Sequence, residues 1–391
     1  MGETDGVRYA DEVYLAIIRR ASDIPSTFAE ALAYDDDDGN IGNGTPNYCL
    51  LVSVFGAHGL AGASSLLDIG VPQFDGTTVT VQATPADIEG CPAPTVTSAK
   101  LEWKLRDGEG GATLDMTADG NDYATQIPAQ NPGSVVRYQV SMTLSNGNTV
   151  RLPRNPVDPY YEYYVGAVEE VYCTDFEVDP GWTTTASGAS NSWRVAAPSA
   201  NTSNGDPTSA TSGSNILTLG LGIPYEPSAT YLASAPLIPI DTTRYAKIRV
   251  QYQRWLGVED STFDSANVLV GSTPVWTNKQ GVGASNHLDG EWRFHDVDIT
   301  DTVAAAAVGS ETNFGLQVGF NLKSDEGLEL AGWALDDFCV VGVLAADICT
   351  GDDCDTAASE TGCCSANQGF ASPLLLALAA LGLMFFRRRR A

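Results

Sequence analysis

Alternation of apolar and polar residues with a period of two is the feature of this chain that most restricts its fold. The pattern runs through TTVTVQATP, SAKLEWKLR and VVRYQVSMTLSNG, and later through YAKIRVQYQRW, ANVLVGS and WRFHDVDIT. Successive side chains of a β-strand point to opposite faces, so such runs indicate half-buried strands. The sequence therefore predicts a mainly β protein.

Turn signals divide these strands into two regions. In residues 71–165, Asp-Gly, Asn-Gly and Pro separate short strands, which is typical of a small β-sandwich, and Trp103 and Tyr138 are predicted core residues. In residues 166–345, the strands and turns are spaced as in a jelly roll, and Trp255 and Trp276 are predicted to lie in its core.

Four tyrosines stand at the end of the first region, in the run Tyr160-Tyr161-Glu162-Tyr163-Tyr164. They could form a platform on which sugar rings stack. They could also pack along a last strand and the junction with the next domain. We favour packing, and both interpretations stay open at this stage.

The first 70 residues have helical character. Apolar residues between Tyr9 and Ala33 predict a helix that Pro25 interrupts, and Leu50–Leu60 predicts a second, short helix. The loop between them begins with Asp35–Asp38. An EF-hand requires ligands at loop positions 1, 3 and 5 and glycine at position 6, and no glycine here gives that spacing. A calcium loop of another kind stays open beside a solvated turn, which we favour.

The C-terminal residues predict a membrane anchor. Phe370–Phe386 is an uncharged, mainly apolar segment of about 17 residues, which is at the short end for a spanning helix. Arg387, Arg388, Arg389 and Arg390 follow it and would stay in the cytoplasm by the positive-inside rule. We expect an anchor over residues 370–391 and a flexible tether with a cysteine motif over residues 346–369.

Charge and cysteine usage exclude some partners. The formal net charge is −28, and nucleic-acid binding needs clustered Lys and Arg, so no nucleic-acid partner is expected. The eight cysteines form no CxxC pair and only three histidines are present, so the spacing of a zinc site is absent. Sparse, even-numbered cysteines fit an oxidising compartment. Proximity alone suggests the pairs Cys49–Cys91 and Cys349–Cys354.

The tail GCCSANQGFASPLLLALAALGLMFFRRRRA resembles the MYXO-CTERM sorting tail of myxobacterial surface proteins. The resemblance implies export, cleavage near Cys363 or Cys364 by a membrane sorting protease, and retention at the cell envelope or surface. The N-terminus, MGETDG, has neither the charge nor the apolar segment of a signal peptide. The simplest expectation is that the chain is the end of a longer precursor.

The string DDDDGNIGNGTPNYCLLVSVFGAHGL resembles the end of the catalytic region of large secreted zinc peptidases of the gluzincin type. One departure is Asn47, where family members often carry His. The larger departure is the missing HExxH motif, which would place two imidazoles one helical turn apart. His58, His287 and His295 form no such pair, so no zinc is expected in this chain.

The two β regions also carry resemblances. Residues 71–165 resemble fibronectin type III and other immunoglobulin-like modules. The segments DFE, LASAPLIPID and GWALDDFCV make residues 166–345 similar to MAM-like jelly rolls, whose first and last strands lie side by side. That resemblance implies a disulfide between Cys173 and Cys339. It also implies a structural calcium site at Glu177 and Asp337, with Asp206 as a weaker third ligand.

Common catalytic motifs are absent: no Lys follows a Gly, no GxGxxG opens a helix, and no GxSxG occurs. The spatial separation of paired carboxylates, on which glycoside hydrolysis depends, is not visible in sequence.

Three hypotheses about function follow. The first is a non-catalytic accessory and anchoring region of an exported surface metallopeptidase, which positions or binds polymeric substrate. The second is a freestanding surface adhesin or glycan-binding protein, and the third an enzyme of unrecognised class. The expected partners are the membrane, a sorting protease, and an extracellular protein or glycan.

Overall fold

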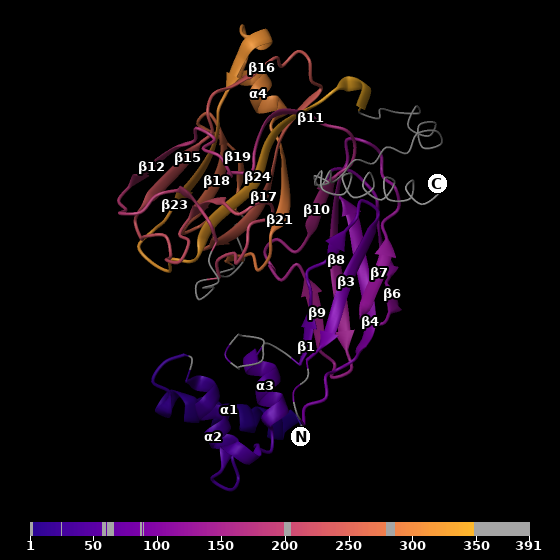
Figure 1. Cartoon of the computed structure of the whole chain (residues 1–391), viewed down its shortest axis with the longest axis vertical. Coiled ribbons are helices and arrows are strands. Elements are labelled where there is room, and N and C mark those ends of the chain that lie inside the picture. Colours follow the sequence, from indigo (N-terminus) through magenta and orange to yellow (C-terminus); the bar gives the residue numbers. More distant parts are fainter. Residues whose placement is uncertain are drawn as a thin grey trace, which may run out of the picture.

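The computed structural model describes residues 3–24, 26–56, 60, 66–86, 88, 90–198, 205–278 and 286–347. Figure 1 shows a small helical unit at the N-terminus and, after it, two β-sandwiches that lie side by side. The protein is mainly β, as the alternating pattern predicts.

The helical unit contains α1 (Glu3–Arg20), α2 (Thr27–Asp35), the 3-10 turn η1 (Ile41–Asn43) and α3 (Tyr48–Gly56). Its core centres on Val13, Ala31 and Leu51. The buried carboxylate of Asp35 ties the unit together, because it accepts hydrogen bonds from the Tyr9 hydroxyl and from the backbone and side chain of Asn47.

The first sandwich is built from two antiparallel sheets of five strands. One sheet has the order β1-β3-β7-β6 with β2 beside β3, and the other has the order β10-β8-β4-β5 with β9 beside β8. Trp103 and Tyr138 lie in the core between the sheets, which confirms their prediction. The strands are β1 (Leu67–Ile69), β2 (Gln73–Phe74), β3 (Thr78–Pro85), β4 (Val96–Leu105), β5 (Gly111–Asp115), β6 (Thr117–Asp119), β7 (Asp122–Gln126), β8 (Val135–Leu144), β9 (Thr149–Leu152) and β10 (Tyr161–Tyr164).

The second sandwich packs a seven-stranded sheet against a five-stranded one. The larger sheet has the order β13-β14-β24-β17-β20, with β11 beside β24 and β21 beside β17, and the smaller has the order β12-β15-β23-β18-β19. A separate pair, β16 and β22, lies near α4.

The elements of the second sandwich are β11 (Glu169–Thr174), β12 (Thr183–Ser187), β13 (Arg194–Ala196), β14 (Ile216–Leu219), β15 (Thr230–Ser234), β16 (Ile238–Ile240), β17 (Lys247–Val258), β18 (Ser265–Val270), β19 (Thr273–Thr277), β20 (His287–Leu288), β21 (Arg293–Asp298), α4 (Thr300–Ala306), η2 (Glu311–Asn313), β22 (Phe314–Leu316), β23 (Val318–Lys323), β24 (Gly332–Val343) and η3 (Ala345–Asp347).

Two disulfides join distant parts of the chain. The first and last strands of the second sandwich pair with each other, and Cys173 opposite Cys339 forms a disulfide with an S–S distance of 2.09 Å. Cys49 and Cys91 form the second, which links α3 of the helical unit to the segment after β3. The suggested pair Cys349–Cys354 lies outside the described residues.

Two sequence expectations need correction. The first sandwich begins at residue 67 rather than 71, because β1 pairs with β3. Trp255 is not a core residue: β17 alternates, so Leu256 enters the core, while Trp255 packs against Trp292 on the outer face with ring centroids 5.8 Å apart. Trp276 packs against the core, as predicted.

The predicted anchor, Phe370–Phe386 with Arg387–Arg390, and the predicted processing site at Cys363 and Cys364 lie outside the described residues. Among the helices that the structure describes, none is long and apolar enough to cross a membrane.

Candidate functional site

The junction between the two sandwiches holds the candidate site, and strand β10 forms its centre. Tyr161 and Tyr163 pack into the core of the first sandwich. Because side chains alternate along a strand, Glu162 between them points the other way, toward β21 of the second sandwich. One face of this short strand therefore packs in the first sandwich and the other face contacts the second. The YEYY sequence fits this position, because its aromatic residues and its carboxylate alternate.

Glu162 joins the sandwiches through hydrogen bonds to both. One of its carboxylate oxygens accepts from the backbone N–H of Asp296 at 2.9 Å and lies 3.0 Å from Nδ1 of His295. The other accepts from Nε of Arg137 at 3.2 Å. Burial opposes ionisation of Glu162, but His295 and the nearby charges of Arg106 and Arg137 outweigh it and lower its pKa to about 2.

Asp296 is a second fixed point at the junction. Arg249 of the neighbouring strand donates to both of its carboxylate oxygens, and Arg106 of the first sandwich donates to its backbone carbonyl at 2.6 Å and to its side chain at 3.1 Å. The Asp296 side chain has no exposed surface. Hydrogen bonds between buried ionised groups are among the strong ones in proteins, so they hold the two bodies in one orientation.

A third group of charges lies beside these residues. The Arg254 guanidinium donates to Asp289 at 2.9 Å and to Asp158 at 2.8 Å, and Arg293 donates to Asp289 at 3.1 Å. Burial would raise the pKa of Asp158, but the charges of Arg254 and Arg293 hold it well below its usual value. Asn155 adds a hydrogen bond to Asp289 at 2.9 Å.

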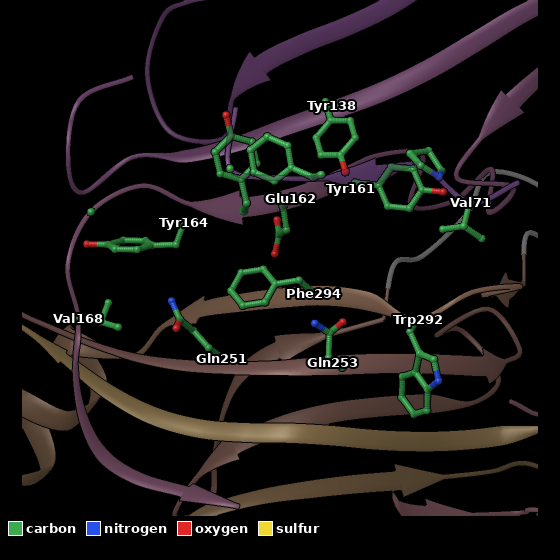
Figure 2. A pocket seen from close by; sticks show the side chains of 15 residues that line it. Val71, Tyr138, Tyr161, Glu162, Tyr164, Val168, Gln251, Gln253, Trp292 and Phe294 are labelled. Carbon is green, nitrogen blue, oxygen red and sulfur yellow. The ribbon is translucent and has the colours of Figure 1, made fainter. Parts of the chain in front are cut away.

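Beside this network lies a cleft of about 420 Å³ that we call the junction cleft. Figure 2 shows tyrosines of the first sandwich along one wall and side chains from β17 and β21 along the other. Its lining consists of Val71, Pro72, Phe74, Gly76, Tyr138, Tyr161, Glu162, Tyr163, Tyr164, Gly166, Val168, Gln251, Gln253, Trp292 and Phe294. Aromatic and aliphatic side chains predominate, with a few polar groups among them, which is the usual make-up of a ligand site.

The sequence left open whether the four tyrosines of residues 160–164 pack at the domain junction or form a platform for sugar rings, and the structure shows where each of them lies. Tyr161 is buried in the junction, and its hydroxyl donates to Glu291 at 3.0 Å, so it packs as expected. Tyr163 and Tyr164 are half-buried and line the cleft. Tyr160 lies outside the lining and donates to Glu102 at 3.1 Å. In this run, Tyr161 therefore packs in the junction, and Tyr163 and Tyr164 line the cleft.

Two histidines are described, and both are part of the junction. His295 pairs with Glu162, and His287 lies 3.4 Å from the Asn155 side chain. Burial lowers the pKa of His287 to about 4, and the charge of Arg254 adds to that effect. A buried histidine that stays neutral beside arginines is placed for packing rather than for proton transfer.

The residues predicted to bind calcium do not form one ligand set. Glu177 accepts from the backbone N–H groups of Ser214 and Asn215, both at 2.6 Å, and Asp337 accepts from the Ser212 hydroxyl at 2.6 Å. These two acids therefore approach the same loop. Asp206 is occupied separately, since it accepts from the backbone N–H of Gly222 at 2.8 Å.

Asp336, beside Asp337, is fully buried. It accepts from the backbone N–H groups of Thr211 and Ser212, and burial raises its pKa to about 6 with help from the charge of Asp337. Calcium binding at Glu177 and Asp337 stays a prediction.

Two acidic groups in the described part of the chain bring three carboxylates within reach of one ion. They are Asp36, Asp37 and Asp38 in the loop after α2, and Glu259, Asp264 and Asp325 at one end of the second sandwich. The first group lies in the acidic loop for which the sequence leaves a calcium site of another kind than the EF-hand open. The second could not be predicted from the sequence, because its members are far apart along the chain.

The sequence also failed to reveal the junction network, although it carried a signal. Arg249 and Arg254 stand inside an otherwise alternating strand, and Arg293 and His295 stand inside another. Charged residues are rarely buried unless they are paired, so charges within predicted strands indicate a polar interface.

Comparisons with known proteins add one similarity in sequence. No family model matches the chain. Bacillopeptidase F from Bacillus subtilis (strain 168) is 28% identical over 246 residues, which are 62% of this chain and 15% of that protein. The chain thus spans less than a sixth of this relative. Together with the two disulfides, the similarity indicates an extracellular protein.

Solved structures give only low scores. The K3 cleaved adhesin domain of Lys-gingipain from Porphyromonas gingivalis has a TM-score of 0.28 at 15% identity and covers 45% of this chain and 99% of its own. A carbohydrate-binding module of the β-sandwich superfamily has a TM-score of 0.26 at 13% identity and covers 70% of this chain and 96% of its own. Scores at this level assign neither a fold family nor a ligand.

Proposed function

We propose that this chain is a non-catalytic accessory region of an extracellular peptidase and that its junction cleft binds the polymeric substrate of that enzyme. The observation that carries the proposal is the aromatic cleft between two sandwiches that the ion pairs Arg106–Asp296 and Arg254–Asp158 join. The similarity to part of Bacillopeptidase F supports the association with a peptidase.

The chemistry of the cleft favours binding over catalysis. Its one carboxylate, Glu162, is committed to four donors or charges and is held ionised by them. A general acid or base must exchange a proton near the working pH, and a carboxylate with a pKa of about 2 is poorly suited to that role. Aromatic walls with uncharged amides instead suit reversible recognition.

The helical unit supports attachment to another folded body. Val7, Tyr14 and Ile18 form an exposed apolar stripe on α1, opposite the face that packs on α2, and Leu50 and Val54 are exposed on α3. A helix that is apolar on more than one face is usually buried in a larger protein. In this proposal the body that covers it is the catalytic part of the peptidase.

We also propose an enzyme class and a location in the cell. We infer a metallopeptidase from the resemblance of residues 35–60 to gluzincin-type enzymes. We also infer retention at the cell surface by Phe370–Phe386 and Arg387–Arg390, after processing near Cys363 or Cys364. The anchor follows from the apolar segment and its arginines, whereas the enzyme class and the processing site follow from sequence resemblance.

A depletion assay tests the binding function. The purified chain is mixed with insoluble protein polymers and insoluble polysaccharides, and the protein left in solution is measured. We expect removal by at least one polymer and a loss of at least about tenfold in affinity on Trp292→Ala, which removes one large aromatic side chain from the lining of the cleft. Phe263→Ala is the matched control, because Phe263 is an exposed aromatic residue outside the cleft.

The outcome against the proposal is retention of full binding by Trp292→Ala, or no binding to any polymer. Hydrolysis of a labelled protein by the purified chain would contradict the non-catalytic part.

The second candidate function is a freestanding surface adhesin or glycan-binding protein, which the same cleft favours. The two candidates differ in the size of the native product. A peptidase accessory region predicts a cell-surface polypeptide well above 41.2 kDa that carries peptidase activity, whereas an adhesin predicts a product of that mass or less. An antibody against the second sandwich, used on whole-cell extract, distinguishes them.

A further inference from the structure

We infer that the junction cleft takes a neutral saccharide chain that is attached to, or mixed with, the polymeric protein substrate of the peptidase. This ligand class rests on the proposed binding function of the cleft. Three properties of the lining support the inference: its charge, its hydrogen-bonding groups and its aromatic surfaces. The contact of β10 with strand β21, beside the cleft, also supports it.

The lining offers no free charge to a ligand. Glu162 is its only carboxylate, and it contains no Lys, Arg or His. Both oxygens of Glu162 are already hydrogen-bonded, one to Asp296 and His295 and the other to Arg137. An anionic ligand such as a uronate or a phosphate would find no cation in the lining, and a cationic peptide would find no available anion. Burying an unpaired charge is costly, so the lining selects for a neutral ligand.

The available polar groups are side-chain amides from β17. Gln251 and Gln253 are two residues apart, so they share the outer face of the strand, and Figure 2 shows both pointing toward the tyrosine wall. Nε2 of Gln251 donates to Asp296 at 2.9 Å, which leaves its carbonyl oxygen as an acceptor. The Gln253 amide has no side-chain hydrogen bond in the described part of the chain. Amides donate and accept, as sugar hydroxyls also do.

Aromatic side chains line both sides of the cleft. On one side, the rings of Phe74 and Tyr163 lie tilted to each other with centroids 4.3 Å apart, and Trp292 and Phe294 line the other side. Aromatic faces are electron-rich, so they attract the polarised C–H groups on the face of a pyranose ring. The cleft volume of about 420 Å³ is within the range of roughly 300–1,000 Å³ for small-ligand sites.

A peptide fits the cleft less well. An extended peptide usually binds by pairing with a free strand edge. Here β10 packs against β21, and the carboxylate of Glu162 already accepts a hydrogen bond from the backbone N–H of Asp296, which is therefore not available to pair with a peptide. Proline-rich peptides use aromatic grooves and offer carbonyl acceptors. The indole N–H of Trp292, the natural donor for them, is already given to Ser209 at 2.7 Å.

Affinity electrophoresis of the full chain tests the inference. The gels contain hydroxyethylcellulose, laminarin, arabinoxylan or galactomannan, and a parallel gel contains carboxymethylcellulose as an anionic polymer. We expect retardation by at least one neutral polysaccharide and none by carboxymethylcellulose. Gln253→Ala should weaken that binding at least about tenfold, and Phe263→Ala should leave it unchanged.

Gln253→Glu is a second variant for the case in which the alanine variant misfolds. It places a negative charge beside the bound sugar and should reduce binding with the circular dichroism spectrum unchanged. The inference is overturned if no neutral polysaccharide retards the chain, if carboxymethylcellulose binds more tightly, or if a proline-rich peptide binds at the cleft instead. Depletion by an insoluble protein polymer, lost in Trp292→Ala, would keep the proposed function while ending the saccharide assignment.

Discussion

At the scale of single residues, Glu162 shows how one side chain links two bodies. Its neighbours Tyr161 and Tyr163 enter the core of the first sandwich, so Glu162 must face outward, and the second sandwich supplies His295 and Asp296 to receive it. The side chain is 5% exposed, so a broken pair would leave buried charges without partners. Such losses are far more costly than the loss of a surface pair.

Glu162→Gln should therefore destabilise the junction. We expect the free energy of unfolding to fall by about 3 kcal/mol, because the charge of Arg137 loses its partner and the charge of Arg106 loses one of its partners. Denaturant unfolding measures the change. Glu102→Gln is the control: Glu102 is an exposed residue of the same sandwich, and its variant should change stability by less than about 1 kcal/mol. Equal effects of the two substitutions would contradict the role given to Glu162.

The junction should also lose stability in acid. The pKa of His287 is about 4 in the folded protein and 6.5 in the unfolded chain. Between these two pH values the unfolded chain therefore binds a proton that the folded protein does not bind. The free energy of unfolding therefore falls as pH decreases from 6.5 to about 4, by up to about 3 kcal/mol from this residue. Glu162 adds a further loss between pH 4.5 and about 2.

His287→Gln should remove the upper part of that dependence. Urea unfolding at about pH 7 and about pH 4.5 measures it. The variant should lose clearly less stability between the two conditions than the wild type. Parallel losses in both proteins would show that His287 does not cause the effect.

At the scale of secondary-structure elements, alternation predicted β17, β18 and β21 well, because one face of each strand packs in a core. The same pattern misplaced Trp255, since a strand with two covered faces carries large side chains on both. The partners of Arg254 could not be predicted, because Asp158 and Asp289 are far away in the sequence and reach it only through the fold.

The pair β11 and β24 closes the second sandwich, and its disulfide should stabilise that closure. Cys173 and Cys339 are separated by 166 residues, so replacing both by Ser should lower the free energy of unfolding by about 3–5 kcal/mol. Guanidinium unfolding followed by tryptophan fluorescence measures the change. The matched control replaces Cys49 and Cys91, which should leave the transition of the second sandwich unchanged. No difference between the two double variants would contradict the prediction.

Calcium binding at Glu177, just after β11, and Asp337, in the middle of β24, is testable by thermal melting. If Glu177 and Asp337 bind the ion, excess calcium should raise the melting temperature by several degrees relative to a chelator, since a ligand at about 100 times its Kd adds about 2.7 kcal/mol. Glu177→Gln should abolish the shift, whereas Asp206→Asn should retain it. A shift that is lost instead in Asp264→Asn would move the site to the other end of the sandwich, and no shift in the wild type would remove it.

At the scale of the whole molecule, the described part of the chain holds its two sandwiches in one relative orientation and is not a set of loosely linked domains. The ion pairs Arg106–Asp296 and Arg254–Asp158 join the two sandwiches, and the Cys49–Cys91 disulfide ties the helical unit to the first of them. The sequence predicted the parts but not the cleft, because its lining combines residues 71–76, 138, 161–168, 251–253 and 292–294. Only the tyrosine run pointed to it. A rigid cleft suits recognition, since little freedom is lost when a ligand binds.

Hydrogen–deuterium exchange on the intact chain, with and without a polymer that it binds, shows where the polymer is bound. We expect slower exchange on both sides of the junction, in residues 161–168 of the first sandwich and in residues 251–253 and 292–294 of the second. Slower exchange confined to the sheet β12-β15-β23-β18-β19, with the junction unchanged, would place binding elsewhere and contradict the account.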